Sequence, residues 1–224
     1  MPSHSPDNVA PPGNFVNFRV LTAASGTYTV PAGVRSLFLV LIGPGGGGGG
    51  VTGNASQTAA AGGGQAGAWL YKYLTNLSAS YSYACPAGGT GGGGNSAGQN
   101  GGNGSHTTFG SLESQYGVGG QGMAAGSAVA IAYGATSSNW GNTGDVDSRG
   151  NVGGYGIRLS GTVAASGAGS NTPWGRGGGQ RTTAGDGNNA TGYGAGGGGA
   201  MSSANTDRTG GSGSQGAILI WEYA

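Results

Sequence analysis

Dense apolar runs occur near the two ends of the chain, at residues 15–21, 36–43 and 217–223. The run SLFLVLIG at 36–43 is apolar almost throughout, which is typical of a strand buried on both faces. Residues 69–77 and 80–88 alternate more evenly between apolar and polar side chains, as half-exposed strands do. No segment repeats apolar residues every 3.6 positions between capping residues, so we expect almost no α-helix.

These runs predict a mostly β protein with irregular segments, built on a small antiparallel β-sandwich. The simplest closure brings the C-terminal strand at 216–224 back to the N-terminal strands at 15–87. The long middle of the chain, residues 88–215, then leaves the sandwich and returns to it. Residues 1–14 include Pro11 and Pro12, which favour extended geometry, so we interpret them as an attachment arm.

The middle of the chain is dominated by glycine, which supplies 57 of the 224 residues. Many of these glycines recur every third position, and a polyglycine-II helix has three residues per turn and no internal hydrogen bonds. Such helices can bond to one another when they pack side by side, because glycine lets the backbones approach. We expect a packed polyglycine-II helix bundle over residues 88–215, with chance spacing as the alternative. Examples of the spacing are Gly88, Gly91 and Gly94, Gly150, Gly153 and Gly156, and Gly210, Gly213 and Gly216.

The balance of charge excludes several partners. Charged residues make up 7% of the chain and the net charge is +1, so bulk electrostatics attract neither nucleic acid nor an anionic membrane. A disordered low-complexity chain is the alternative that this composition raises, and the apolar runs at both ends argue against it. The lone cysteine, Cys85, has no partner within the chain for a disulfide, and we interpret it as a small apolar residue in a strand.

The breaks between glycine tracts hold most of the exposed-looking aromatic and charged residues. They lie at 104–111, 134–148, 169–189 and 201–208. A rigid bundle with such loops at its distal end is a plausible recognition surface, because aromatic residues bury area with little loss of entropy. For the tryptophans, capping of the bundle against water is the alternative. The candidate receptor-binding residues are Trp140, Tyr155, Trp174, Arg176, Arg181, Asp207 and Arg208, whereas Trp69 and Trp221 belong to the core.

Nothing in the sequence predicts an enzyme. The chain has 7 acidic residues and no convincing carboxylate pair, and it has no nucleophile motif of the hydrolase kind. Asp145, Asp147 and Asn151 offer oxygen ligands of the type that calcium prefers, but no closing glutamate follows, and a solvated turn is the better interpretation. We expect no metal and no cofactor.

Several stretches, in order along residues 20–224, resemble a known family. GTYTVPAGVRSLFLVLIGPGGGGGG (26–50), GGGQAGAWLYKYL (62–74) and GGSGSQGAILIWEY (210–223) carry the resemblance, with Cys85-Pro86 where a valine-glycine pair is commoner. The family is the glycine-rich domain found at the ends of many bacteriophage tail fibres. The composition is also similar to that of phage adhesins built from polyglycine-II helices, although their loops do not align with this chain.

The resemblance implies a bacteriophage tail-fibre or tail-tip protein that binds a host surface receptor, an outer-membrane protein or a glycan, through loops on a glycine-rich tip. It implies a location in the virion after synthesis in the host cytoplasm, with other tail and fibre proteins as partners, and a homotrimer. The alternative is a purely structural tail-tip cap without a receptor of its own. No receptor-contact residue is carried over from the family.

Overall fold

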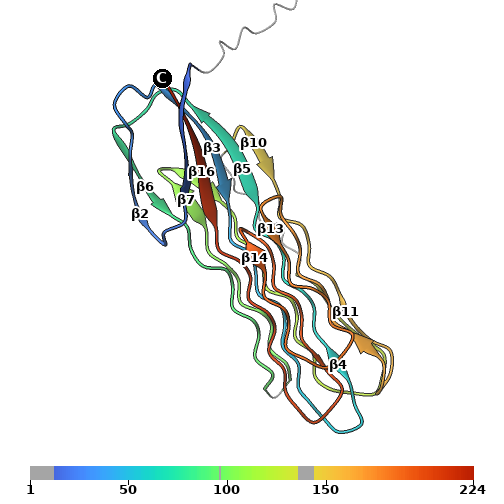
Figure 1. Cartoon of the computed structure of the whole chain (residues 1–224). Coiled ribbons are helices and arrows are strands. Elements are labelled where there is room, and N and C mark those ends of the chain that lie inside the picture. Colours follow the sequence, from blue (N-terminus) through green and yellow to red (C-terminus); the bar gives the residue numbers. More distant parts are fainter. Residues whose placement is uncertain (1–12, 96, 136–143) are drawn as a thin grey trace, which may run out of the picture.

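The computed structural model describes residues 13–95, 97–135 and 144–224, and these form an elongated molecule (Figure 1). One end is a pair of packed β-sheets, and the other is a rod of extended glycine-rich segments that run side by side. The described residues form strands, turns and irregular segments and no helix, as the sequence predicted. In this part of the chain there is accordingly no helix of the length and apolarity that crossing a membrane requires.

The first sheet has five antiparallel strands in the order β1 (Phe15–Leu21), β16 (Ala217–Tyr223), β3 (Ser36–Ile42), β5 (Trp69–Leu74) and β10 (Val146–Ser148). The C-terminal strand therefore lies between the two N-terminal strands, pairing Leu219 with Val20 on one side and with Val40 on the other. The predicted return of the C-terminal strand is confirmed.

The second sheet contains β2 (Gly26–Thr29), β6 (Ser80–Ala84), β7 (Thr107–Phe109) and β8 (Leu112–Ser114), all antiparallel. Residues 104–111 were expected to form a distal loop, and this expectation is wrong, because Thr107–Phe109 pairs with β6 and turns into β8. Strands β7, β8 and β10 all come from the region predicted to be glycine-rich, so the sandwich draws on more of the chain than its two ends.

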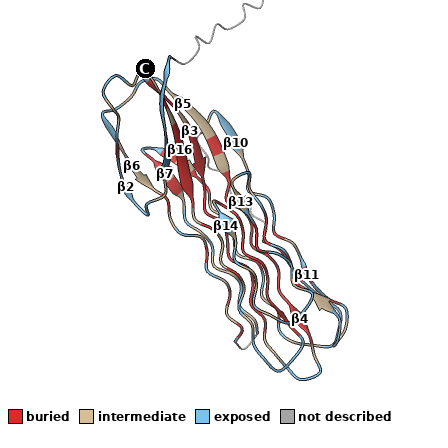
Figure 2. Cartoon of the chain, in the orientation of Figure 1, coloured by how far each residue is buried: buried red, intermediate tan, exposed pale blue. Residues whose placement is uncertain are grey.

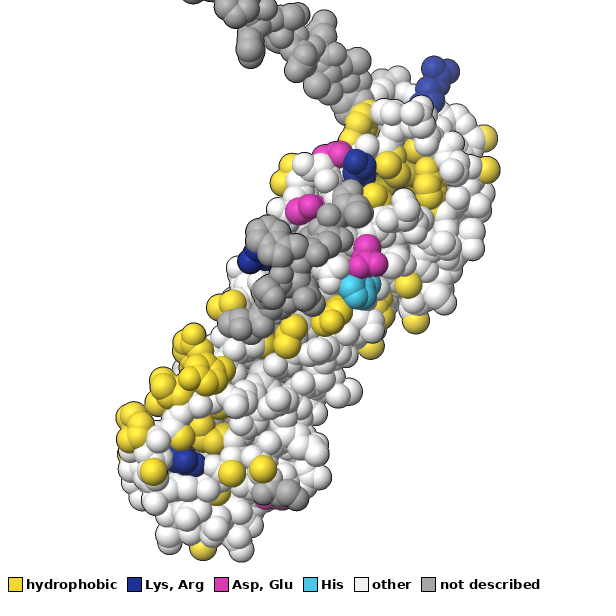
Figure 3. All heavy atoms as spheres, turned by 180° about the vertical axis from the view of Figure 1, so that it is seen from behind, with side chains coloured by type: hydrophobic (Ala, Val, Ile, Leu, Met, Phe, Trp, Pro, Cys, Tyr) yellow, Lys and Arg dark blue, Asp and Glu magenta, His cyan; other side chains and the backbone are white. Residues whose placement is uncertain are grey.

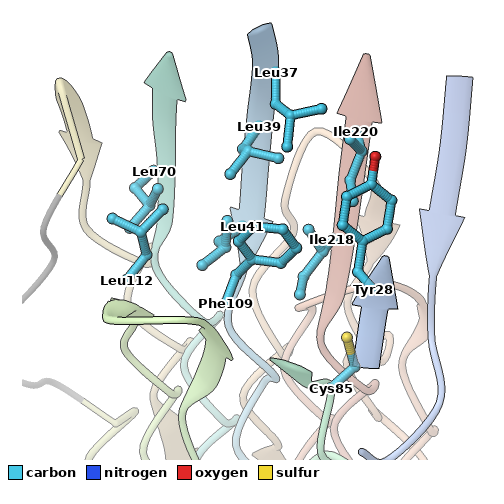
Figure 4. Packing of buried hydrophobic residues seen from close by; sticks show 10 residues of the cluster. All are labelled: Tyr28, Leu37, Leu39, Leu41, Leu70, Cys85, Phe109, Leu112, Ile218 and Ile220. Carbon is cyan, nitrogen blue, oxygen red and sulfur yellow. The ribbon is translucent and has the colours of Figure 1, made fainter. Parts of the chain in front are cut away.

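The two sheets pack face to face through one apolar cluster (Figure 4). Its members come from both sheets and include Leu39, Leu41, Ile220, Tyr28 and Phe109. Cys85, one residue beyond β6, is 1% exposed in this cluster, and burial raises the pKa of its thiol to about 12. The interpretation of this cysteine as a small apolar residue is confirmed, but its expected place in a strand is wrong, because β6 ends at Ala84.

The opposite face of the five-stranded sheet carries a second cluster. Val40, Ile42, Ala217 and Leu219 are buried there, and the tryptophans expected in the core, Trp69 and Trp221, pack against them half-buried. Trp174 and Tyr193, from the rod, also pack against this cluster. The rod therefore docks on the sheet that it continues.

The rod is held together by backbone hydrogen bonds whose partner changes with every residue. From Gly45 to Gly50 the amides donate at 2.8–2.9 Å to three different segments in turn, and the same segment returns every third residue. The carbonyls of this stretch accept from three further segments in the same rotation. The acceptors, in order, are Ser214, Gln65, Gly102, Gly211, Gly62 and Gln99. This central segment therefore has six backbone neighbours and is completely buried (Figure 2).

Glycine is required in this central segment because the neighbouring backbones leave no room for a side chain. A Cβ on Gly48 would lie 2.0 Å from the carbonyl oxygen of Gly198, and one on Gly47 would lie 2.0 Å from that of Thr90. Where the rod admits a side chain inside, it is often alanine, as at Ala61 and Ala66. The interior of the rod is thus largely backbone and small side chains, with a few larger ones such as Gln65, Met123 and Arg158.

The extended segments run alternately away from the sandwich and back to it, so the breaks in the glycine pattern fall at both ends of the rod. The turn at 171–175 lies near the sandwich, where Trp174 packs on Trp69, whereas 157–165 and 201–208 lie at the distal end (Figure 1). The expectation that all four breaks gather at one end is wrong for this geometric reason.

Short strands pair across the rod. They are β4 (Ala59–Ala60) with β15 (Met201–Ser202), β11 (Gly156–Arg158) with both β9 (Ala130–Ala132) and β12 (Ala164–Ala165), and β13 (Gly175–Arg176) with β14 (Thr191–Gly192).

Candidate receptor-contact surface

Large apolar side chains form an exposed stripe along two neighbouring strands near the distal end of the rod. Ile157 of β11 pairs directly with Ile131 of β9, and their side chains are 40% and 53% exposed. Two residues away from Ile157 and Ile131, on the same face of the strand pair, the rings of Tyr155 and Tyr133 meet edge to face, with their centroids 6.0 Å apart. We call this surface the distal stripe; its members are Val129, Ile131, Tyr133, Tyr155, Ile157, Leu159 and Val163, all exposed.

The charged residue of the same strand points the other way. Arg158, between Ile157 and Leu159, is buried, and its guanidinium donates to the carbonyl oxygens of Ala128 (2.7 Å), Ala124 (2.7 Å) and Thr58 (3.2 Å). These carbonyls belong to two loops of the distal end, so Arg158 ties both loops to β11. The strand is inverted relative to an ordinary surface strand, with its cation inside and its aliphatic residues in water.

The interior of the rod is tight beside this arginine. Gly156 and Ala132 face inward, and a Cβ on Gly156 would lie 2.2 Å from the carbonyl oxygen of Ala60. Arg158, two residues further along β11, points inward at the place where its guanidinium reaches the loop carbonyls. Elsewhere on the rod many outward residues are polar, as at Thr90, Gln99 and Gln121, so the interior does not dictate that the stripe be apolar.

The stripe continues into a shallow apolar hollow of about 430 Å³. Its lining is Ile157, Leu159, Val163, Ala164, Ala165 and Thr182, which includes no charged side chain. Hydrophobic side chains gather on the same flank of the rod in the space-filling view from behind (Figure 3). Contiguous apolar surface of this kind on a protein in water typically marks a contact site.

Of the predicted receptor-binding residues, Tyr155 belongs to the distal stripe. Trp140 lies outside the described residues. Trp174 lies at the junction with the sandwich, its ring 5.9 Å from that of Trp69 in an edge-to-face contact. Arg176 is exposed on β13, close to that junction. The structure therefore brings Trp174 and Arg176 together at one depression, whereas Tyr155 belongs to a different surface.

The three remaining candidates hold loops of the rod. Arg181 donates to the carbonyl oxygen of Asp186 (2.8 Å) and to Oδ1 of Asn188 (3.2 Å). Asp207 accepts a 2.8 Å hydrogen bond from the amide of Gly53, and the backbone of Arg208 pairs with that of Val51. These contacts join turns of the distal end to one another and occupy polar groups that a ligand would otherwise use.

The acidic residues weighed as calcium ligands form a braced turn. Asp145 accepts from the ammonium group of Lys72 and from the amide of Tyr73, and the hydrogen bond from Lys72 is the main cause that lowers the pKa of this carboxyl. Asp147 accepts a 3.0 Å bond from the amide of Gly144. Among the residues that the structure describes, no three His, Cys, Asp or Glu side chains gather as metal ligands.

Sequence reasoning missed most of the distal stripe, although a signal was present. VAIAY (129–133) and YGIRL (155–159) place a large apolar residue at every second position, which is the period of a strand. Both segments are short and lie inside glycine-rich sequence, so they do not stand out beside the apolar runs at the chain ends.

These features define an all-β protein with a glycine-rich rod attached to a small sandwich. A family model described as "Glycine-rich domain" matches residues 22–223, and the chain belongs to that family. A comparison with curated proteins gave no match.

Proposed function

We propose that this chain is a bacteriophage tail-fibre or tail-tip protein that binds a host bacterial surface receptor, with the distal stripe as its contact surface. In this proposal the sandwich end is the attachment end. The described residues begin at Gly13, which lies beside the C-terminal residue of the sandwich, and the amide of Ala224 donates to the carbonyl of Asn14. Attachment and contact are thus assigned to opposite ends of the molecule.

The observation that carries the proposal is the inverted strand β11. Burying Arg158 while exposing Ile157 and Leu159 leaves apolar surface in water. This exposure costs about 25 cal/mol of free energy for each Å² of apolar surface. A partner that covers Ile131, Ile157 and the two tyrosines would recover this free energy on binding. Aromatic residues and a dry apolar centre are also the usual basis of high affinity at protein interfaces.

We further propose that the glycine-rich segments are packed polyglycine-II helices. The support is the three-residue rotation of hydrogen-bond partners along Gly45–Gly50, since a helix with three residues per turn directs its amides to three neighbours in sequence. A rod with bonds in all directions resists bending and would hold the distal stripe at a fixed distance from the sandwich.

The same proposal includes the partners and the location that the resemblance implies. The chain would be part of the virion, carried by other tail or fibre proteins, and assembled as a homotrimer. The order of matching motifs along residues 20–224 supports this assignment, which rests on resemblance and not on the geometry.

The test is binding of the purified, fluorescently labelled chain to bacteria infected by the phage that encodes it. The Ile131→Thr/Ile157→Thr double variant keeps β-branched residues on both strands and removes apolar surface. We expect binding to fall at least tenfold, because two large apolar contacts contribute about 1 kcal/mol or more each. The matched control is Val16→Thr/Val20→Thr, which alters exposed valines of β1 at the other end.

Loss of binding in the distal variant with retention in the control would support the proposal. Equal binding by both variants would contradict the assignment of the distal stripe. Failure of the wild-type chain to bind any strain that the phage infects would favour a structural tail-tip cap, and absence of the chain from purified virions would overturn the phage assignment. Circular dichroism and thermal unfolding verify that each variant is folded.

A further inference from the structure

A second surface, separate from the distal stripe, lies on the flank of the rod near the sandwich. A shallow depression of about 530 Å³ is lined by Asn171, Thr172, Pro173, Trp174, Gly175, Arg176, Thr191 and Gly192. An adjoining hollow of about 290 Å³ is lined by Arg176, Gly177, Gly179, Asn188, Asn189 and Thr191. The two share Arg176 and Thr191, so they form one continuous groove with Arg176 at its centre.

The groove is built on a braced hairpin. Arg176 pairs with Thr191 across β13 and β14, and the Thr172 hydroxyl donates a 2.6 Å hydrogen bond to the carbonyl of Tyr193. Trp174 packs on Trp69 of the sandwich and remains partly exposed in the groove. The backbone that carries the lining residues is therefore held in place by the surrounding fold.

The polar groups that the groove leaves for a ligand are mainly donors. Oδ1 of Asn171 accepts from the amide of Gly177 (2.7 Å), and Oδ1 of Asn189 accepts from the amide of Ser212 (2.8 Å). Because a backbone amide can only donate, these contacts fix the side-chain oxygens inward and leave both amino groups for other partners. Neither hollow includes an acidic residue, and within the described chain Arg176 makes no ion pair.

We propose that this groove binds a glycan that carries a carboxylate or phosphate group. The guanidinium of Arg176 offers paired N–H donors that match such an anion. The amino groups of Asn171 and Asn189 face a ligand rich in acceptor oxygens, and the exposed part of the Trp174 ring offers an apolar surface to the C–H face of a sugar. The groove is open and shallow, and the exposed Gly179 lets a ligand approach the backbone.

This inference goes beyond the proposed function and does not depend on the distal stripe. The probes are trigalacturonic acid, the same trisaccharide with its carboxyl groups reduced to alcohols, and glucose 1-phosphate. Binding is followed by NMR titration of the indole N–H of Trp174, which is assigned with the Trp174→Phe variant. We expect at least one anionic probe to shift this signal saturably and the neutral trisaccharide to bind about tenfold more weakly.

Arg176→Gln is expected to weaken anionic binding about tenfold, whereas Arg35→Gln, which removes one exposed positive charge from the sandwich, is expected to leave it unchanged. A response to trigalacturonic acid alone would identify a carboxylate sugar, and a response to glucose 1-phosphate alone a phosphorylated one. Equal binding of the neutral trisaccharide, no response to either anion, or an Arg176→Gln variant that binds like wild type would overturn the proposal. The Ile131→Thr/Ile157→Thr variant should bind the probe normally, which separates this outcome from that of the proposed function.

Discussion

The hydroxyl of Tyr28 donates a 2.7 Å hydrogen bond to Oε1 of Glu222, which joins the two sheets of the sandwich through a carboxylate that is 1% exposed. Arg19, on β1, donates to the same oxygen at 2.6 Å. Burial raises the pKa of Tyr28 above its usual value, and the hydrogen bond and the negative charge of Glu222 add to the shift. The contact therefore keeps Tyr28 as a neutral donor to a buried charge.

Removing this hydroxyl should destabilise the sandwich. Tyr28→Phe leaves the buried carboxylate with a single donor to Oε1, so we expect the free energy of unfolding to fall by about 1–3 kcal/mol. The control is Tyr73→Phe, which removes a 3.0 Å bond to the uncharged Ser36 hydroxyl and should have a smaller effect. Urea denaturation monitored by tryptophan fluorescence measures both. Equal losses would contradict the role assigned to Glu222.

Cys85 should make the stability of the chain depend on alkaline pH. Its thiol pKa is about 12 in the folded chain against an ordinary value of about 9, so the unfolded chain releases the proton first as pH rises. The contribution is fully present below pH 9 and is lost as pH rises toward 12. We expect the stability difference between wild type and Cys85→Ala to shrink from pH 8 to pH 11 in urea titrations. A constant difference would mean that the folded thiol ionises normally.

The packing of the rod predicts opposite results for two glycines. Gly48→Ala places a Cβ 2.0 Å from a backbone oxygen, so we expect a loss of about 3 kcal/mol or more, or failure to fold. At Gly179 the nearest atom to an added Cβ is the side-chain nitrogen of Asn188 at 3.5 Å, an ordinary contact. Gly179→Ala should be neutral or slightly stabilising, because alanine restricts the unfolded chain. Thermal unfolding compares the two, and a well-tolerated Gly48→Ala would refute the close backbone packing.

Arg158 should act as a local clamp on the distal end. Arg158→Met removes three hydrogen bonds to loop carbonyls, and we expect local opening of the loops near Thr58 and Ala124–Ala128 to become easier by about 2–3 kcal/mol. Hydrogen exchange with mass spectrometry should report faster exchange in peptides from these loops and unchanged exchange in the sandwich. The exposed Arg35 provides the control as Arg35→Met. Uniform loss of protection over the whole chain would argue against a local role.

The sandwich could be predicted because its strands obey the common rule that large apolar residues lie inside. The apolar runs of β3 and β16 contain buried residues at every second position. They are Leu39 and Leu41 in β3 and Ile218 and Ile220 in β16, and all four are completely buried. This apolar pattern is visible in each strand by itself, however long the chain between β3 and β16 is. Strand β7 was missed because Thr107–Phe109 is short and lies between glycine-rich stretches, and only tertiary pairing with β6 makes it a strand.

The distal surface could not be predicted because the rod reverses the same rule. Ala132, Gly156 and Arg158 face inward, while Ile131 and Ile157 face water. The alternating pattern gives the period of these strands but not which face is buried. Which end of the rod a break occupies depends on counting every reversal of the chain, so Trp174 was predicted at the distal end and lies against the sandwich.

The proposed role of the distal stripe in binding the phage's receptor can be tested by competition for adsorption. Host cells are incubated with excess purified chain, and the rate of phage adsorption is then measured. We expect wild-type chain to slow adsorption in proportion to the receptor it occupies, and the Ile131→Thr/Ile157→Thr variant to have little effect at the same concentration. Cells coated with wild-type chain that adsorb phage at the normal rate, or a variant that competes as well as wild type, would contradict the claim.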